Sequence, residues 1–179
     1  MRIIPKKFRN EDILTRVGWI NDKRINQTMF FDLPASVENT QKWFEAIKDC
    51  KNRIDFTFFN DEDKIIAMGG FTGINSTHKN AEFYVMVNPE MQGMGIGKQV
   101  SFWMYNYAFS KLDLHKIYLY TNDDNVAAYS IYEKAGFVLE GILKEHKWKN
   151  DKFQNRRFYG LLKSDWNNLP WKNIIVDEI

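Results

Sequence analysis

The chain has 179 residues, of which 44% are hydrophobic and 27% charged, so it fits one folded domain and is too apolar for a disordered protein. The net charge of +2 excludes the basic surface that nucleic-acid binding needs, and we assign the pair Arg156-Arg157 to a solvated strand edge. No apolar run reaches the roughly 20 residues of a membrane span, no signal-peptide core follows the basic N-terminus, and the single cysteine, Cys50, cannot form an internal disulfide. We therefore expect a cytoplasmic protein.

Apolar periodicity predicts helices and strands in alternation along the chain. The first element is a helix over residues 11–20, with Ile13, Leu14, Val17 and Ile20 on its apolar face. The next are a helix over 37–48 capped by Ser36, a hairpin of strands 55–59 and 64–74, a strand over 80–87, a helix over 96–110, a strand over 116–120, a helix over 126–135, and strands over 137–142 and 157–162. This order predicts a mixed α/β fold: one domain over residues 1–179 with helices on both faces of a mixed sheet, ending in a C-terminal tail over 164–179 that contains Trp166 and Trp171.

The most informative segment is the glycine-rich turn between the strand over 80–87 and the helix over 96–110. Gly93, Gly95 and Gly97 alternate there, and the turn opens the helix. The first amides of a helix have no intrahelical acceptor and attract anions, and glycines let a phosphate approach them. The G-x-G-x-G spacing differs from the Rossmann G-x-G-x-x-G, and Gln99 stands where a Walker loop needs Ser or Thr. The segment therefore predicts a pyrophosphate site, with a ligand-free turn as the alternative.

Two motifs carry a resemblance to a known family. Residues 92–97, QGMGIG, resemble the Q/R-x-x-G-x-G/A signature of the GNAT superfamily of N-acetyltransferases. Residues 125–137, NVAAYSIYEKAGF, resemble the family's N-x-x-A-x-x-x-Y-x-K-x-G-F segment downstream. The resemblance implies the GNAT fold: a mostly antiparallel central sheet with one splayed strand pair and helices on both faces. It also implies that acetyl-coenzyme A (acetyl-CoA) is the cosubstrate and, by analogy, that the protein forms a homodimer.

The resemblance also implies which residues hold the cosubstrate. The backbone of Met86 and Val87 would pair with its pantetheine arm, Asn125 would contact that arm, and Tyr132 would lie near the sulfur. The phosphate loop would consist of Gln92, Gly93, Met94, Gly95, Ile96, Gly97 and Lys98.

The chemistry of acetyl transfer needs an acid and a base. A phenol such as Tyr132 can protonate the departing thiolate, and Glu82 is the candidate base that removes a proton from the attacking amine. The alternatives are a half-buried helix aromatic for Tyr132 and an ion-pair partner or substrate anchor for Glu82. Alternation along the strand places Glu82, Tyr84 and Met86 on one face. No spacing of His, Cys and carboxylates predicts a metal site.

The acceptor is expected to be a small-molecule primary amine. In this fold the first helices form the acceptor wall, which here offers Asn21, Asp22, Arg24, Asn26, Gln27, Phe30 and Phe31. Polar amides and aromatic rings favour an amino sugar or a nucleotide-linked amino sugar, whereas Asp22 and Asp32 would attract a polyamine. His78 lies near the acceptor mouth or on a surface loop.

Three subfamilies resemble different parts of the chain. Residues 73–75 and 78–79, ahead of Asn88-Pro89, resemble the amino-sugar acetyltransferases of the pseudaminic acid pathway. Residues 81–83 and 89–93 resemble spermidine acetyltransferases, and similar features occur in ribosomal-protein N-terminal acetyltransferases. We expect the amino sugar and keep the other two as alternatives. A non-catalytic acyl-CoA-binding module is the alternative from another class, and it would need neither Tyr132 nor a base.

Overall fold

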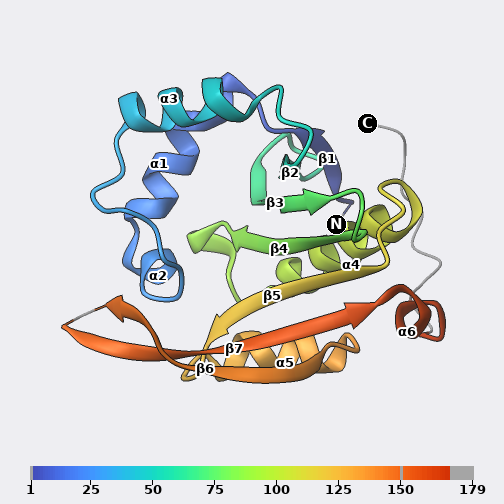
Figure 1. Cartoon of the computed structure of the whole chain (residues 1–179). Helices are drawn as coiled ribbons and strands as arrows, with labels where there is room; N and C mark the ends of the chain where they lie inside the picture. Colours follow the sequence, from blue (N-terminus) through green and yellow to red (C-terminus); the bar gives the residue numbers. More distant parts are fainter. Residues whose placement is uncertain (1, 150, 170–179) are drawn as a thin grey trace.

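The computed structural model describes residues 2–149 and 151–169, which form one seven-stranded sheet flanked by helices (Figure 1). The strands are β1 (Ile4–Lys7), β2 (Ile54–Phe59), β3 (Ile65–Asn75), β4 (Asn80–Val87), β5 (Lys116–Asn122), β6 (Val138–Lys149) and β7 (Lys152–Leu162). The helices are η1 (Asn10–Asp12), α1 (Ile13–Asn21), α2 (Lys23–Asn26), α3 (Val37–Ile47), η2 (Pro89–Met91), α4 (Ile96–Ser110), α5 (Val126–Lys134) and α6 (Lys163–Asn167). None of the helices within these residues is long and apolar enough to cross a membrane.

The sheet has the order β1-β2-β3-β4-β5-β7-β6, and every pair is antiparallel except β4 and β5. These two parallel strands pair only over Asn80–Glu82 and Lys116–Tyr118, after which their ladder stops. β4 continues to Val87 and β5 to Asn122, so the two strands diverge over their remaining lengths. The mixed, mostly antiparallel sheet with a splayed strand pair is therefore confirmed.

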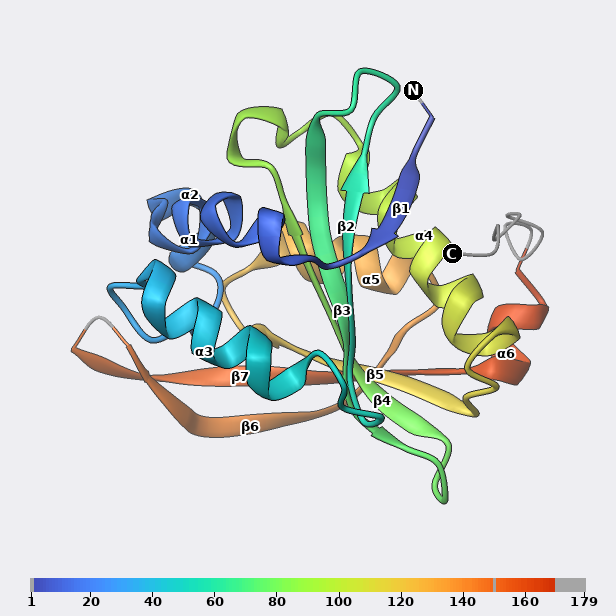
Figure 2. The same ribbon diagram turned by 90° about the horizontal axis from the view of Figure 1, so that it is seen from above.

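Alternating side chains of the sheet feed two hydrophobic cores on opposite faces. Phe56 and Phe58 of β2 are fully buried in the core that includes α4, Ala135 and Phe137. Between them, Thr57 points to the other face and donates a hydrogen bond to Asp12 (2.7 Å) under α1. Figures 1 and 2 show α1 and α3 on this second side and α4 and α5 on the first, as predicted for helices covering both faces.

The N-terminal elements differ from the sequence prediction in two ways. Ile4–Lys7 forms the edge strand β1, which the sequence did not predict. The segment is short and contains a proline and two lysines. It suits an edge because Pro5 has no amide hydrogen to donate to a second neighbouring strand. On α1, Leu14 is 72% exposed, so its assignment to the apolar face is wrong. The buried face carries Arg16 instead, only 4% exposed and three residues after Ile13.

The C-terminal hairpin is longer than its predicted strands. β6 and β7 pair from Val138 opposite Gly160 to Lys149 opposite Lys152, with register shifts near Glu140 and between Leu143 and Lys147. The exposed surface of β6 hides it from an analysis based on apolar periodicity.

The chain then enters α6, whose Trp166 is 1% exposed and donates its indole hydrogen to Asn106 (3.1 Å). Trp171 lies outside the described residues.

Candidate active site

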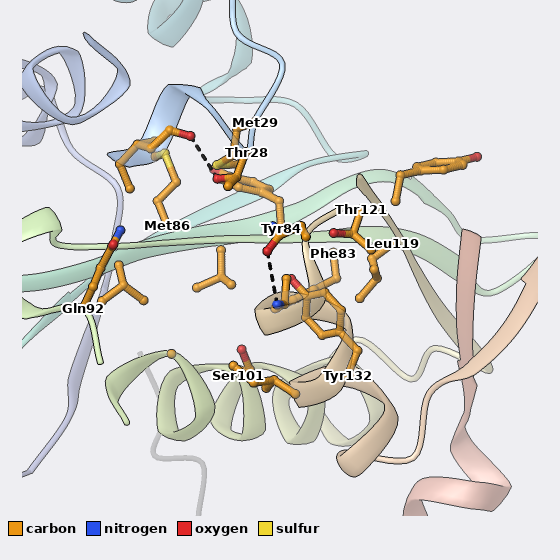
Figure 3. A pocket seen from close by; sticks show the side chains of 18 of the residues that line it. Thr28, Met29, Phe83, Tyr84, Met86, Gln92, Ser101, Leu119, Thr121 and Tyr132 are labelled. Atoms are coloured by element: carbon orange, nitrogen blue, oxygen red, sulfur yellow. Dashed lines mark hydrogen bonds between the residues drawn. The ribbon is translucent and has the colours of Figure 1, made fainter. Parts of the chain in front are cut away.

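The divergence of β4 and β5 opens a cleft with a volume of about 1430 Å³. One wall comes from β4 and the start of α4, a second from β5 and α5, and a third from α1, α2 and residues 27–31. Figure 3 shows Phe83 and Tyr84 of β4 in the middle of the cleft, with Thr28 and Met29 on one side and Ser101 and Tyr132 on the other. The cleft therefore joins the glycine-rich turn, the second motif and the first helices, which are far apart in the sequence.

The glycine-rich turn presents an uncapped helix start to this cleft. Gly93 and Gly95 have φ angles of +79° and +77°, a region that favours glycine, and α4 begins at Ile96 with no side-chain cap. By contrast, Ser36 caps α3 through a hydrogen bond from the Asn39 amide (3.1 Å). An uncapped N-terminus of a 15-residue helix is suited to an anion, because its amides and its dipole are both available.

The predicted cosubstrate residues are largely brought together. Met86, Val87, Gln92, Gly93, Gly95, Ile96, Gly97, Lys98, Asn125 and Tyr132 all line the cleft. Gly97 lies so close to β4 that an added Cβ would meet Val87 Cγ2 at 3.2 Å. Met94 differs: its side chain is 63% exposed and is not part of the lining. Met94 could therefore contact the cosubstrate only through its backbone.

Tyr132 occupies a hydrophobic position at the cleft. Its ring packs edge-on against Phe83 (centroids 6.4 Å apart) and tilted against Phe137 (5.8 Å). Burial raises the pKa of Tyr132 to about 12, so the phenol stays protonated at physiological pH. A neutral phenol on the wall of a cleft is the state that a general acid needs.

Asn125 has a second task that the motif did not predict. Its side chain caps α5 by accepting a hydrogen bond from the Ala128 amide (3.2 Å), while the residue also lines the cleft. The cap fixes the first turn of the helix that carries Tyr132.

Glu82 lies on β4 opposite Thr72 of β3 and Tyr118 of β5, at the point where the parallel pairing ends. Burial raises the pKa of its carboxyl, and Arg156, Lys147 and Arg53 act in the opposite direction. Glu82 therefore has the raised pKa that suits a base working near neutral pH, and it faces cations rather than other carboxylates.

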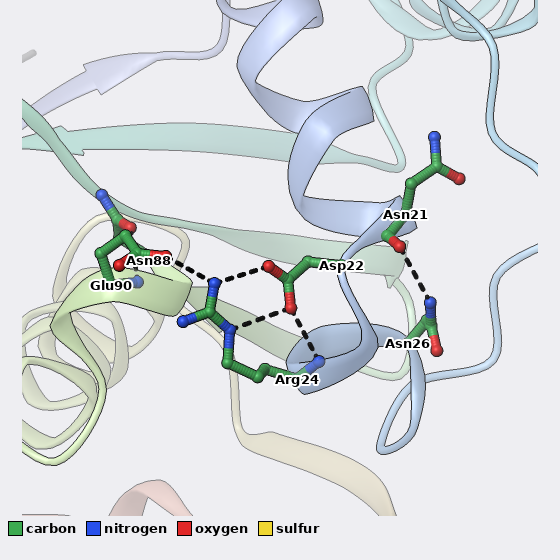
Figure 4. Close-up of polar contacts among 6 residues, drawn as sticks. All are labelled: Asn21, Asp22, Arg24, Asn26, Asn88 and Glu90. Carbon is green, nitrogen blue, oxygen red and sulfur yellow. Dashed lines mark hydrogen bonds and ion pairs between the residues drawn. The ribbon is translucent and has the colours of Figure 1, made fainter.

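The first helices contribute only part of the expected acceptor wall. Arg24, Gln27, Phe30 and Phe31 line the cleft, whereas Asn21, Asp22 and Asn26 do not. Figure 4 shows why: Asp22 caps α2 and pairs with Arg24 (2.7 Å), which also reaches Glu90 of η2 (2.5 Å). The Asn21 side chain donates a hydrogen bond to the Ala35 carbonyl and accepts one from the Ala35 amide, both of 2.9 Å. Asp22 is therefore neutralised, and Asp32 is exposed outside the lining.

The sequence did not predict several basic residues of the lining. Arg156 is not at a solvated edge: β7 lies between β5 and β6, and its guanidinium stacks near Tyr120 (4.8 Å) inside the cleft. Arg16, Arg53, His146 and Lys147 also line it, whereas His78 sits in an exposed turn outside. The sequence could have indicated that Arg16 is buried, because this charged residue falls among the apolar positions of a predicted helix. The others depend on pairing between distant strands.

No group of three or more His, Cys, Asp or Glu within residues 2–149 and 151–169 is arranged to hold a metal ion. The groups present in the cleft are instead those that bind phosphates, move protons and carry positive charge.

Comparison with known proteins places this geometry in a family. Residues 2–138 match the model of the acetyltransferase (GNAT) domain. The chain belongs to the GNAT family. A curated relative, spermidine N(1)-acetyltransferase of Vibrio cholerae, is 34% identical to this acetyltransferase over 151 residues, which are 83% of this chain and 87% of the relative.

Two further comparisons agree. Spermidine N(1)-acetyltransferase of Escherichia coli K12 is 37% identical over 82 residues, 46% of this chain and 44% of the relative. A crystal structure of spermidine N-acetyltransferase from Vibrio cholerae in complex with CoA and spermine has a TM-score of 0.89 at 26% identity, covering 93% of this chain and 98% of that one. The GNAT protein described here is thus an N-acetyltransferase, and the mixed α/β prediction is confirmed as the GNAT fold.

Proposed function

We propose that this N-acetyltransferase moves the acetyl group of acetyl-CoA onto the primary amine of a small molecule. The observation that carries the proposal is the shared cleft. It brings an uncapped, glycine-bordered helix start, a diverging strand edge and the protonated phenol of Tyr132 together in one place.

The residues of the cleft fit acetyl-CoA. Gly93, Gly95, Gly97 and the first turn of α4 would hold its pyrophosphate, because glycines keep side chains away from the amides. The β4 edge at Met86 and Val87 has no β5 partner and is free to pair with the pantetheine amides as an added strand would. When bound, the cosubstrate supplies an activated acetyl group as a thioester.

Two side chains would handle the protons. Tyr132 holds a proton on its phenol oxygen and can donate it to a leaving sulfur, whose thiol has an ordinary pKa of about 8.5. Glu82, directly or through water, would accept the proton that an attacking amine loses. Its raised pKa brings it closer to neutrality than an exposed glutamate.

A polyamine is the first candidate acceptor, and the relatives are its support. Two curated relatives are named spermidine N(1)-acetyltransferases, and the similar crystal structure contains spermine. Glu82 would be the carboxylate that attracts a polyamine to the reaction centre.

A second candidate is an amine that carries an anionic group, such as a nucleotide-linked amino sugar. The lining charges favour it, because a polycation gains nothing from a predominantly basic cleft. Among the described residues, the lining has one carboxylate, Glu82, and seven cationic side chains, of which Arg24 and Arg53 are paired with carboxylates outside the lining: Arg16, Arg24, Arg53, Lys98, Lys134, Lys147 and Arg156.

The test is a mass-spectrometric screen of the purified chain with acetyl-CoA and three acceptor groups: polyamines, amino sugars with and without phosphate, and peptides with free N-termini. An acetylated product that depends on both enzyme and acetyl-CoA is expected from a small-molecule amine. Acetylation of peptides alone would indicate a protein N-terminal acetyltransferase. Tight CoA binding without any acetylated product would indicate a non-catalytic binding module.

A further inference from the structure

A buried cation on α1 has no anionic partner. Arg16 is 4% exposed, its Nη1 atom is buried without a hydrogen-bond partner, and no residue among 2–149 and 151–169 forms a salt bridge with it. A guanidinium has five donors and stays charged at any physiological pH. Burying such a group without a partner is unfavourable, so the site is incomplete as it stands.

Aromatic rings hold the Arg16 guanidinium in place without satisfying its donors. Its central carbon lies 4.5 Å from the ring centroid of Trp43, 5.7 Å from that of Phe8, 5.8 Å from that of Phe31 and 5.9 Å from that of Tyr84. Cation–π contacts stabilise the charge through the ring faces, but they offer the N–H groups no in-plane acceptor. The cage orients the side chain and leaves its hydrogen-bonding capacity for something else.

The buried carboxylates around Arg16 are already engaged. Asp12, one helical turn before Arg16, accepts hydrogen bonds from the Thr57 hydroxyl (2.7 Å) and the Arg9 amide (2.9 Å). Asp55 accepts two hydrogen bonds from Arg53 (2.6 and 2.9 Å) and another from the Tyr84 hydroxyl. Burial raises the pKa of Tyr84 to about 12, with Asp55 adding to the rise and Arg16 and Arg53 opposing it, so both guanidiniums act on the same phenol. Arg16, Arg53 and Asp55, together called the Arg16 cluster, therefore carry one excess positive charge.

The cluster opens into the acceptor side of the cleft. Arg16, Phe31, Arg53 and Tyr84 all belong to the lining of the cleft. Glu82 lies two residues from Tyr84 on the same strand, a separation of roughly 7 Å along the backbone. A bound molecule can therefore reach the carboxylate with its amine and the guanidinium with a distant group.

We infer that Arg16 forms an anion subsite that binds a carboxylate or phosphate of the acceptor while the amine of the acceptor lies at Glu82. The inference rests on the proposed acetyl transfer and selects between its two acceptor candidates. A polyamine would place an ammonium group beside the excess charge of the Arg16 cluster. An acceptor with an amine at one end and an anion at the other would neutralise both ends of the site.

The test compares acceptors that differ only in the anion. Lysine is cadaverine with a carboxylate, and glucosamine 6-phosphate is glucosamine with a phosphate, so the two pairs also distinguish the two anions. We expect the anionic member of at least one pair to have a kcat/KM at least about tenfold above that of its partner, as a charge-assisted hydrogen bond predicts. Arg16→Gln should reduce this preference about tenfold, mainly by raising KM for the anionic member. Lys42→Gln, which removes the same charge from an exposed pair with Glu38 on α3, should keep the preference.

The outcomes separate the two proposals. No acetylated product from any amine would refute the proposed function itself. Turnover with equal kcat/KM within both pairs, or with spermidine well above both anionic acceptors, would refute the anion subsite and leave the acetyl transfer standing. If Arg16→Gln fails to fold, Arg16→Lys keeps the positive charge but lacks the paired N–H donors of the guanidinium, and it should lower the preference for the anionic acceptor. Equal kcat/KM within both pairs in wild type refutes the subsite without any variant, whereas its assignment to Arg16 requires the loss of preference in an Arg16 variant.

Discussion

Replacing Tyr132 by phenylalanine removes the proposed acid and little else. The ring contacts with Phe83 and Phe137 are kept, and no hydrogen bond of the hydroxyl is found among the described residues, so the free energy of unfolding should change by less than about 1 kcal/mol. With a pKa of about 12, only about one phenol in 10,000 is ionised at pH 8, so nearly every enzyme molecule carries the proton. General acids contribute about 100-fold or more to rates.

We therefore expect kcat of Tyr132→Phe to fall about 100-fold, which corresponds to about 2.7 kcal/mol of barrier, with KM for acetyl-CoA changed little. The assay is the release of free thiol with the best acceptor from the screen, and thermal unfolding reports folding. Tyr129→Phe on the same helix is the matched control, because Tyr129 contacts Arg157 (4.3 Å) and does not line the cleft. A kcat of the Tyr132 variant within twofold of wild type would refute the role as acid.

Three further predictions concern other parts of the account. Glu82→Gln should lower kcat/KM at least about tenfold. The kcat/KM of the wild type should decline as the pH drops through the pKa of Glu82, which lies above the usual glutamate range, because the protonated carboxyl cannot accept a proton. If Glu82 is the base, the pH profile of the variant should lack that decline. Gly95→Ala forces a side chain into a backbone conformation with φ +77° and should lower the free energy of unfolding by about 1 kcal/mol. It should also weaken CoA binding measured by calorimetry, and an unchanged affinity would exclude a role for this loop in CoA binding. Trp166→Ala removes a 1% exposed indole bonded to Asn106 and should cost about 3–5 kcal/mol in urea unfolding, whereas a loss below 1 kcal/mol would mean that α6 contributes little.

Local signals explain what could be predicted from the sequence. The glycines at 93, 95 and 97 are required by φ angles and by close packing on Val87, so their spacing can be read without knowing the fold. The helix after them has an apolar face that repeats every 3–4 residues, which is why α4 was found within its bounds. Tyr132 was found through its motif, and its high pKa depends on packing that only the structure shows.

Long-range pairing explains what could not be predicted. Arg156 looked solvent-exposed because nothing local reveals that β7 lies between β5 and β6. The register shift between Leu143 and Lys147 occurs in the stretch of β6 that brings His146 and Lys147 to the cleft, and an exposed strand carries no periodic signal for it. Arg16 falls among the apolar positions of its helix in the sequence, but only the structure shows the aromatic rings that surround its guanidinium.

A crystal structure of the chain with bound CoA tests the central claim most directly. The pyrophosphate is predicted to lie on the amides of the turn from Gly93 to Gly97, the pantetheine arm along β4, and the sulfur within hydrogen-bond reach of the Tyr132 hydroxyl. A pyrophosphate bound away from the start of α4, or a sulfur that cannot reach Tyr132, would contradict the account.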